Sequence, residues 1–525
     1  MKARARRGQS AEALATKQRE ISISEFFSKN RHLLGFDNRR KALLTAVKEA
    51  VDNALDACEE AGVAPDVRIE IEAMRKDERY RIAVEDNGPG IVPAQVPKIF
   101  GQLLYGSRFH TLKQARGQQG IGISAAGMYG QLTTGKPMVI VSRTGPRRPA
   151  LRYQVAIDTA RNRPEVTGEK EVAWDRPHGT RVEIELEGRY HRGRQSVEEY
   201  LKQTSIANPH VDIRYRGPDG TEMHLERVTT ELPEAPLEIK PHPHGVELGR
   251  LIKMLKETRA RTLGSFLRTD FSRVGEKAAA AICAAAGLEP ASRPGRIART
   301  EADRLIEAIR TVKLMAPAPS GIVPIGEALL LRSLKSEIPE AAFYTACTRS
   351  PAVYRGNPFQ IEVGLAYGGA LAADDLARVL RFANRVPLLH QPGACLITRT
   401  LVATDWKHYG LAQARGALPT GPLVVLVHLA SVWVPFTSES KEAIADYTEI
   451  QREIRLAVQE CGRRLRLFVS RRRRAADAEK KRSYIEKYIP HIGQALQDIL
   501  ALSAADRDRT IRDLSAILEK SRKMD

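Results

Sequence analysis

The chain contains 525 residues, of which 42% are hydrophobic, and it carries a formal net charge of +20 at pH 7. This length exceeds what a single hydrophobic core supports, so about three domains are expected. The composition is typical of a globular protein, and no apolar stretch is long enough to cross a membrane. The excess of Lys and Arg favours a polyanionic partner, nucleic acid before an acidic membrane, although a merely basic surface would give the same charge.

The N-terminal segment and the cysteines bear on cellular location. The first ten residues, MKARARRGQS, are basic, but no apolar segment follows them, so they do not match a secretory signal. The five cysteines are scattered, without a C-x-x-C pair or a histidine at metal-ligand spacing. This pattern predicts reduced thiols in a cytoplasmic protein and argues against a structural zinc site.

An α/β layer is predicted over residues 20–225. Residues 1–20 are polar and expected to be mobile, residues 21–36 form a short helical arm, and apolar residues recur at helical spacing from 37 to about 60. A glycine-dense region spans residues 101–135. Alternating strand patterns lie at 67–74, 80–88, 138–144, 151–157 and 180–186. This order of helix, strands, loop and strands predicts the layer.

The second half of the chain contains two further regions. Four prolines mark a boundary at 231–247, after which helices are predicted at 247–255, 261–267, 272–288 and 299–312, a compact helical insert over about 230–312. A Pro/Gly-rich linker at 316–326 leads into another α/β region with strands predicted at 359–369, 395–404 and 423–432. Long, highly charged helices are predicted from about Ser440, and a final amphipathic segment ends the chain.

The stretch 48-KEAVDNALDA-57 places Glu49, Asn53 and Asp56 within roughly 60° of one another on a helix. An amide oxygen is a hard ligand suited to Mg²⁺, which borrows few protein ligands and adds phosphate oxygens. A carboxylate one turn earlier can orient and deprotonate a water. Taken by itself, the helix is better explained by a solvated polar stripe.

Two glycine-containing motifs follow. In 85-EDNGPGI-91, Asp86 ends a strand, where a carboxylate can accept a hydrogen bond from an exocyclic amine such as that of adenine. In 117-GQQGIGISAAG-127, Gly117, Gly120 and Gly122 precede a helix predicted to begin near Ser124, an arrangement that lets backbone N–H groups approach phosphate oxygens. The second motif does not match Walker A. Considered separately, the first motif is explained by an ordinary turn and the second by a flexible surface loop.

The combined order of E-x-x-x-N-x-x-D, D-x-G-x-G, a glycine lid and 179-GT-180 resembles the GHKL ATPases, which include gyrase-type topoisomerases, Hsp90 chaperones, histidine kinases and MutL mismatch-repair proteins. The resemblance implies the Bergerat α/β sandwich, ATP and Mg²⁺ as cofactors, Glu49 as general base, Asn53 as the metal ligand and Thr180 as support for the adenine site. The Glu argues against a histidine kinase. Nucleotide binding is implied for Asn53, Asp56, Asp86, Gly88, Gly90, Ser107, Gly117, Gln118, Gln119, Gly120, Ile121, Gly122, Ile123, Ser124 and Thr180.

Four further stretches resemble the family of topoisomerase VI B subunits: 32-HLLGFDN-38, 101-GQLLYGSRFH-110, 241-PHPHGVELGRLIKML-255 and 405-DWKHYGL-411. The resemblance covers about Ile21 to Ser470 and makes Lys407 the lysine that reaches the γ-phosphate. It implies a mobile basic N-terminus (1–20), an ATPase domain with its arm (21–229), a helix-two-turn-helix domain (230–312), a transducer domain like ribosomal S5 domain 2 (313–470) and a basic helical C-terminal segment (471–525).

The implied activity is that of an ATP-hydrolysing type II DNA topoisomerase subunit. ATP binding would dimerise two copies and gate the passage of double-stranded DNA, while an A subunit in an A₂B₂ assembly cleaves and religates both strands, in the nucleoid of the cytoplasm. Two segments have open interpretations. Residues 272–288 form either a DNA-binding hairpin or a well-packed helix. The basic residues 471–474, with Lys480, Lys481 and Arg482, bind phosphates along DNA, form the solvated face of a helix or contact a partner subunit. The alternatives are a chaperone or mismatch-repair GHKL ATPase and a non-enzymatic DNA-binding scaffold.

Overall fold

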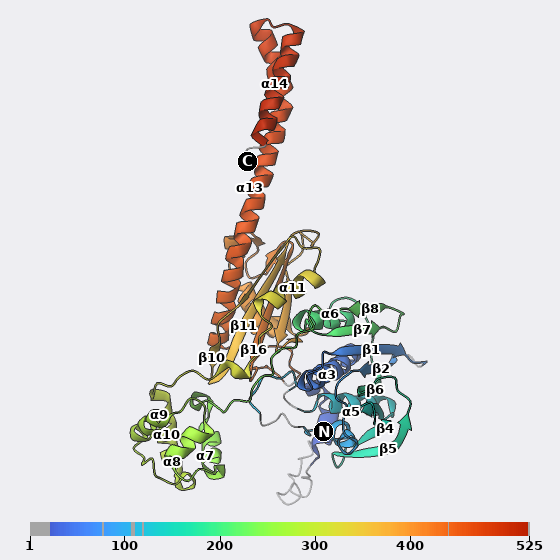
Figure 1. The fold of residues 1–525 in the computed structure, drawn as a ribbon, viewed down its shortest axis with the longest axis vertical. Coiled ribbons are helices and arrows are strands. Elements are labelled where there is room, and N and C mark those ends of the chain that lie inside the picture. The colour runs from blue at the N-terminus through green and yellow to red at the C-terminus, as the bar shows by residue number, and fades with distance from the viewer. Residues whose placement is uncertain (1–20, 76–77, 107–110, 118–119, 439, 523–525) are drawn as a thin grey trace, which may run out of the picture.

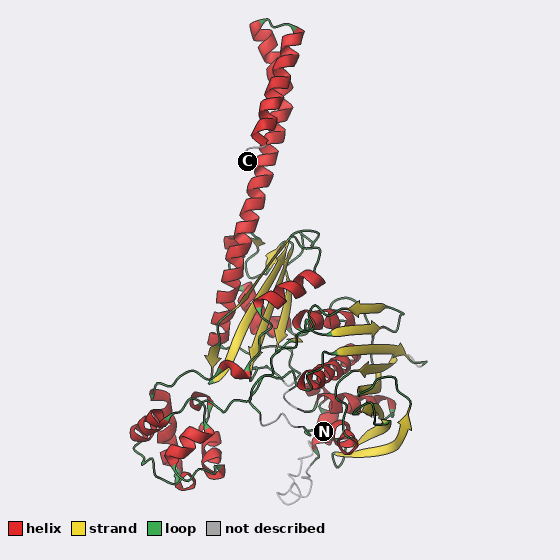
Figure 2. Cartoon of the chain, in the orientation of Figure 1, coloured by secondary structure: helices red, strands yellow, loops and turns green. Residues whose placement is uncertain are grey.

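The computed structural model of the chain describes residues 21–75, 78–106, 111–117, 120–438 and 440–522 (Figure 1). The expected mobile segment 1–20 therefore lies outside the described residues. Two large sheets, a separate group of helices and one very long helix make up the described part (Figure 2). None of its helices combines the length and apolar content that spanning a bilayer requires.

The first sheet has eight strands in the order β5-β4-β3-β6-β2-β1-β7-β8. Only β1 and β7 pair in parallel, and the other neighbours are antiparallel. β1 alternates buried and half-buried residues, as expected for a strand with one face on the core. The strands are β1 (Asp66–Ala73), β2 (Arg79–Glu85), β3 (Met138–Arg143), β4 (Ala150–Asp158), β5 (Arg163–Val172), β6 (Gly179–Glu187), β7 (Asp212–Arg216) and β8 (Glu222–Leu225).

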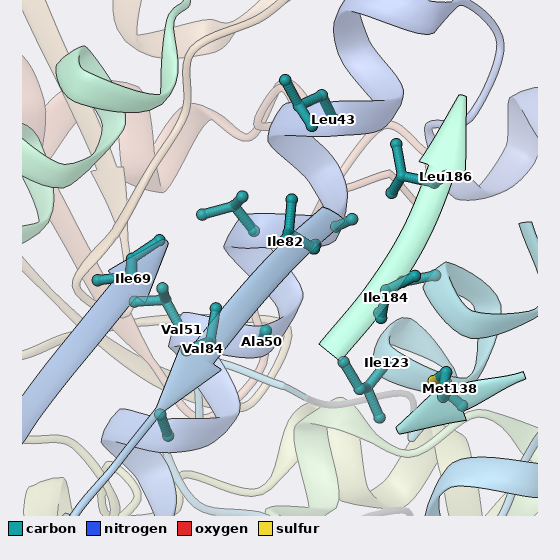
Figure 3. Close-up of a cluster of buried hydrophobic side chains, with 14 of the residues drawn as sticks. Leu43, Ala50, Val51, Ile69, Ile82, Val84, Ile123, Met138, Ile184 and Leu186 are labelled. Atoms are coloured by element: carbon teal, nitrogen blue, oxygen red, sulfur yellow. The ribbon is translucent and has the colours of Figure 1, made fainter. Parts of the chain in front are cut away.

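Helices cover the buried face of this sheet. The longest is α3 (Arg39–Glu60), and it begins at Asn38, whose side chain accepts a hydrogen bond from the Lys41 N–H at 2.9 Å. Its apolar stripe packs on the sheet, with Leu43 and Val51 against Ile82, Val84 and neighbouring side chains (Figure 3). The other helices of this layer are α2 (Ile23–Lys29), α4 (Val96–Gly101), α5 (Gly122–Thr134) and α6 (Val197–Ala207). These elements confirm the predicted α/β layer.

Four short helices form a separate body, seen apart from both sheets in Figure 1. They are α7 (Leu248–Glu257), α8 (Leu263–Asp270), α9 (Glu276–Ala286) and α10 (Arg299–Thr311). Their own hydrophobic core includes Leu251, Phe266, Ile282 and Leu305, all fully buried. The helices expected in this part of the sequence are therefore present.

The second sheet runs β10-β11-β16-β12-β13, with β9 paired to β11. Its central strand β16 is buried at every residue. Val425 and Val427 face the core that holds α13, while Val424 and Leu426 face the core that holds α11. The elements are α11 (Glu327–Glu337), β9 (Phe343–Thr348), β10 (Ala352–Tyr354), β11 (Asn357–Tyr367), β12 (Arg378–Ala383), β13 (Val386–Pro387), α12 (Leu396–Val402), the short pair β14 (Ala412–Gln413) and β15 (Pro419–Thr420), β16 (Leu423–Ser431), α13 (Thr448–Leu500) and α14 (Ala504–Arg522).

The second sheet shares a core with helix α6 of the first layer. Ile206 and Ala207 at the end of α6 belong to the same buried cluster as Leu330 and Leu334 of α11 and Phe382 of β12. The cluster also takes in the face of β16 turned away from α13. The second sheet therefore packs directly on the first layer through α6 and α11.

Two sequence predictions were wrong in this half. Residues 395–404, predicted as a strand, form helix α12 because Leu396, Ile397, Thr400 and Leu401 recur at helical spacing and are buried on one side. The long helix begins at Thr448 instead of about Ser440, since Ile444 forms a β-bridge with Phe436 and keeps the preceding segment extended.

Candidate functional site

A cavity of about 640 Å³ lies at the junction of the two layers, within the usual range for a small-molecule site. Its walls come from α3, the end of β2, the start of α5 and two segments of the second sheet region, 387–390 and 440–442. Residues far apart in the sequence therefore meet at one place.

The α3 wall presents Glu49 and Asn53 to the cavity. The Glu49 carboxylate lies against Gly122 at the first turn of α5, so closely that any side chain on residue 122 would collide with Oε2. Asp56 is different, because it is buried behind the wall and its Oδ1 accepts a hydrogen bond from Arg116 at 2.7 Å. The three polar residues share a stripe of the helix, but only two of them line the cavity.

A second wall, at the end of β2, carries Asp86. Its Oδ1 accepts hydrogen bonds from the backbone N–H of Gly88 at 2.8 Å and of Thr180 at 3.1 Å. Burial raises the pKa of Asp86 to about 6, although these two N–H donors act in the opposite direction. Because both bonds fall on one oxygen, the second oxygen is available to a ligand. Gly90 approaches the Arg143 carbonyl with φ +70°, where any side chain would collide.

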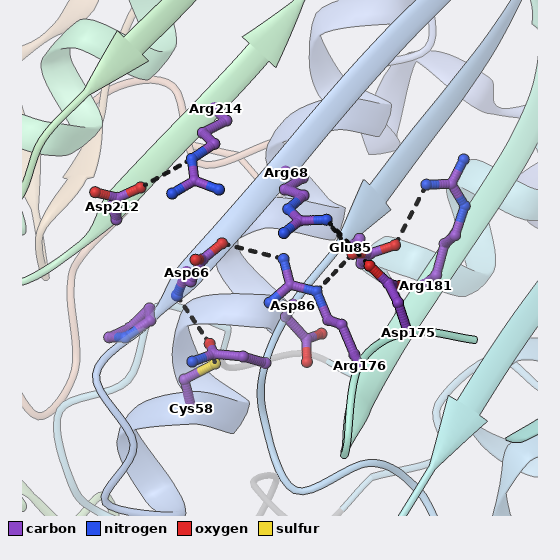
Figure 4. A network of polar contacts seen from close by, with 12 residues as sticks. Cys58, Asp66, Arg68, Glu85, Asp86, Asp175, Arg176, Arg181, Asp212 and Arg214 are labelled. Carbon is purple, nitrogen blue, oxygen red and sulfur yellow. Dashed lines mark hydrogen bonds and ion pairs between the residues drawn. The ribbon is translucent and has the colours of Figure 1, made fainter. Parts of the chain in front are cut away.

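A buried ion network holds the end of β2 beside this residue (Figure 4). Glu85 accepts hydrogen bonds from Arg176 Nε at 2.5 Å and from Arg181 Nη1 at 3.4 Å. Arg176 also reaches Asp66 on the adjacent strand at 3.0 Å. The network ties three strands and the loop before β6 together, so Asp86 projects from a rigid edge.

The glycine segment forms the third wall. Gly117, Gly120 and Gly122 all line the cavity, together with Ile121 and Ile123. Helix α5 begins at Gly122, so its N-terminal N–H groups border the same space. Ser124, also predicted to bind, is fully buried and bonds to the carbonyls of residues 99 and 102 instead. The predicted contacts Ser107, Gln118 and Gln119 lie outside the described residues.

The lysine of the second sheet region at this cavity is Lys441, which the sequence reasoning missed. It lines the wall, and its Nζ donates to the backbone carbonyl of Arg116 at 3.5 Å. Lys407 is exposed on the turn Trp406–Tyr409 and does not line the cavity. That turn packs on α13, where Gly462 lies under the Tyr409 ring, and therefore on the face of the second sheet turned away from the first layer. The local sequence 438-SESKE-442 gives little indication of this position, since Lys441 is marked there only as a positive charge in a loop.

The remaining predicted residues occupy expected places. Thr180 and Gly90 line the cavity beside Asp86, and Gly88 is adjacent through its N–H bond. Together the walls offer a buried carboxylate acceptor, an amide, a second carboxylate, an ammonium group and backbone N–H donors. Such a set suits a ligand with an amino-substituted base and a string of phosphates.

Comparison with known proteins gives matches along nearly the whole chain. Residues 317–481 match the family described as "Topoisomerase VI B subunit, transducer", and residues 38–189 match "Histidine kinase-, DNA gyrase B-, and HSP90-like ATPase". A protein of Methanococcoides burtonii, named as the B subunit of type 2 DNA topoisomerase 6, is 50% identical over 97% of this chain and 81% of its own length. Proteins of the same name match from Archaeoglobus fulgidus (48% identical, 97% and 84% covered) and Pyrococcus horikoshii (39%, 90% and 91%).

Proposed function

The chain belongs to the family of type 2 DNA topoisomerase 6 B subunits, and from this premise we propose that the cavity between its two layers is where ATP is bound and hydrolysed. The chain is an ATP-hydrolysing topoisomerase subunit with a GHKL ATPase fold and a transducer domain. The observation that carries the site assignment is the convergence of Glu49, Asn53 and Asp86 on one cavity.

Asp86 reads the adenine base in this proposal. Its Oδ1 is held by two backbone N–H groups, which orients Oδ2 toward the exocyclic amine. Thr180 and Gly90 border the same end of the cavity. The chemical support is that a buried carboxylate favours an amine donor over a keto acceptor, so adenine is favoured over guanine.

Asn53 holds Mg²⁺, and Glu49 activates the water. The amide of Asn53 is exposed to the cavity, and its hard oxygen would be a suitable ligand for magnesium. Bound magnesium supplies neutralisation of phosphate charge. Glu49 orients a water at the terminal phosphate and accepts its proton. The glycine segment and the start of α5 donate N–H groups to the phosphates.

Lys441 contacts the terminal phosphate from the second sheet. Its ammonium group lines the cavity within reach of the Arg116 carbonyl, next to Gly117. An ammonium group on a flexible stem is a common point-charge contact for phosphate. Lys441 belongs to the second sheet region and touches the nucleotide. The affinity for a nucleotide with its terminal phosphate therefore depends on where the second sheet lies.

We also propose the finer assembly. Two copies dimerise on ATP binding, with residues 21–36 crossing between them, and they join two A subunits in an A₂B₂ complex that passes double-stranded DNA in the nucleoid of the cytoplasm. The domain limits 21–229, 230–312, 313–470 and 471–525 are part of this proposal. The chaperone, mismatch-repair and non-enzymatic alternatives are not favoured, because the family match covers nearly the whole chain.

The test is an ATPase and DNA-relaxation assay with purified chain, alone and with an A subunit. ATP hydrolysis should rise with supercoiled DNA, and relaxation should require the A subunit. Glu49→Ala should leave nucleotide binding largely intact and lower turnover by about 100-fold or more. Asn53→Ala should weaken Mg²⁺-dependent nucleotide binding. Wild-type turnover in Glu49→Ala would reject Glu49 as the base, and relaxation by the chain alone would reject the division of labour.

A further inference from the structure

Arg116 lies at a buried junction between α3, the glycine segment and the second sheet. Its guanidinium donates to Asp56 at 2.7 Å, to both carboxylate oxygens of Glu59 at 2.8 and 2.6 Å, and to Asn208 Oδ1 at 2.5 Å. Asp56 and Glu59 lie on α3, one and two turns beyond Asn53. Arg116 directly precedes Gly117. It therefore joins the helix that carries the proposed metal ligand to the glycine segment.

The charges at this junction are firmly paired. Burial acts against the charged forms, yet the two carboxylates raise the pKa of Arg116, and Arg116 and His210 lower the pKa of Glu59. His210 Nε2 lies 2.6 Å from Glu59 Oε1. Replacing a buried ion network with apolar side chains is often neutral or stabilising. A contribution to stability therefore does not by itself explain why this junction contains an ion network.

Two asparagines continue the junction into the second sheet. Asn208 bonds Arg116 through its oxygen and donates from Nδ2 to the Arg385 carbonyl at 3.2 Å. Asn384 donates to the Ala115 carbonyl at 3.0 Å and exchanges two hydrogen bonds with the backbone of Ser431, at 2.8 and 2.9 Å. Asn384 and Arg385 connect β12 to β13, and Ser431 ends β16. The chain before the glycine segment is therefore bonded to the central strand of the second sheet.

The turn at Asn384 and Arg385 is itself held from several sides. Both residues have positive φ, 48° and 67°, in the left-handed region that non-glycine residues seldom adopt. The Arg385 N–H donates to His428 Nε2 at 3.0 Å, and His428 Nδ1 lies 2.8 Å from Glu362. The conformation of the turn is thus fixed by buried partners on β16 and β11.

The linker between the helical body and the second sheet forms a further contact. The side-chain oxygen of Gln114 accepts a hydrogen bond from the Val323 N–H at 2.7 Å, and its side-chain nitrogen donates to the Val323 carbonyl at 3.0 Å. The backbone N–H of Gln114 donates to the Gly321 carbonyl at 2.8 Å. Three successive residues, 114 to 116, are therefore bonded to the linker, to the second sheet and to α3. They directly precede Gly117, which lines the cavity.

We propose that Arg116 is a positioning residue that couples occupation of the cavity to the position of the second sheet. A ligand that draws the glycine segment inward pulls on residues 115 and 116. Their buried hydrogen bonds cannot be exchanged for water, so the pull passes to α3 on one side and to the turn at Asn384 on the other. The inference rests on the proposed ATP site, and it adds a second connection besides Lys441.

The test measures the distance between the two layers by pulsed electron spin resonance in the full-length chain. Spin labels are attached at Lys136→Cys and Ser336→Cys, two exposed positions on the first layer and on α11, while the five native cysteines are buried. A non-hydrolysable ATP analogue with Mg²⁺ is added to saturation, and its binding is measured separately by fluorescence. In the otherwise unmodified chain the analogue should shift the distance distribution.

Three variants break the junction in different ways. Arg116→Lys keeps the charge and loses the planar fork. Asn208→Asp keeps an acceptor for Arg116 and places an oxygen against the Arg385 carbonyl. Asn384→Gly keeps the left-handed backbone and removes the bond to Ala115. Each should bind the analogue with an affinity within about fivefold of the parent, and the shifted population should fall to less than half.

Arg349→Lys is the matched control. Arg349 pairs with Glu453 and Glu460, and these two carboxylates both lie on α13, away from the cavity. The substitution loses the same fork, and the distance shift should stay at the parental size. Thermal melting identifies the variants that fold, and one folded junction variant suffices. A parental shift in such a variant, or no shift in the parent although the analogue binds, would overturn the coupling; failure of the parent to bind the analogue would instead reject the proposed ATP site.

Discussion

At Asp86, two backbone N–H groups and a low-polarity setting act in opposite directions on one carboxyl group. The net result is a pKa raised to about 6 from the ordinary value of 3.8. Because the pKa is higher in the folded chain than in the unfolded chain, proton binding favours the folded state, and this contribution to stability is lost as the pH rises from about 4 to about 6. The group is ionised at neutral pH, when it can accept a hydrogen bond from an amine.

This titration predicts a pH dependence of nucleotide binding. Affinity for an ADP probe should fall as the pH decreases from 7 to 5, because protonation turns the Asp86 carboxylate into a weaker, neutral acceptor for the adenine amine. Asp86→Asn should bind about 10- to 100-fold more weakly at pH 7, since an amide nitrogen then faces the amine.

The variant also serves as the control for titration of the nucleotide itself. Isothermal titration at both pH values should show a smaller pH effect in Asp86→Asn than in the parent chain. Equal pH effects in the two proteins would exclude Asp86 as the titrating group.

At the scale of elements, two loops of the second sheet region differ in the face they occupy. Lys441 lies between Phe436 and Ile444, which form a β-bridge, and faces the cavity, whereas the turn with Lys407 packs on α13. The difference follows from the two-sided burial of β16, which gives the sheet one face toward α6 and α11 and one toward α13.

Paired alanine variants should separate the two lysines. Lys441→Ala should lower ATP turnover by about tenfold, because it removes a charged contact to the terminal phosphate. Lys407→Ala should change turnover by less than about twofold, as expected for an exposed side chain away from the site. Steady-state ATPase assays without DNA decide the point, and the opposite ranking would restore the role that the family resemblance implies for Lys407.

The sequence predicted those parts of the site that depend on local pattern. Glu49 and Asn53 reach the cavity because helical spacing alone sets their common face. Asp56 shares the stripe, but its partner Arg116 is distant in sequence, and spacing carries no information about it. Lys441 and the connection through Asn384 arise only from packing of the second sheet on α6, which no local pattern specifies. The helix α12 was missed because its β-branched residues resemble a strand.

At the scale of the whole molecule, one hydrophobic cluster joins the second sheet to α6 of the first layer, and another belongs to the helical body. Phe382 and Leu334 lie in the first cluster with Ile206, and Phe266 lies in the second. The sheets are therefore expected to unfold together, and the helical body is expected to unfold as a separate unit.

A pair of core truncations tests this division. Phe382→Ala should destabilise the unit of both sheets by about 3–5 kcal/mol, because it leaves a cavity in the shared core. Phe266→Ala should destabilise the helical body by a similar amount and leave nucleotide binding within about twofold. Calorimetry together with a nucleotide-binding assay distinguishes the two effects. Loss of binding in Phe266→Ala at a temperature where the sheets remain folded would contradict the division.

The single helix α13 runs for 53 residues, which corresponds to about 80 Å. Its first turns are embedded beneath the second sheet, with Ile450, Ile454 and Leu465 fully buried, and beyond them it projects outward with α14 folded back along its outer part (Figure 1). From Leu465 to Leu500 the rod is about 50 Å long, so a tilt of about 10° at its root would sweep the tip through about 9 Å. Any small rotation of the sheet would be magnified in this way at whatever is attached to the distal end.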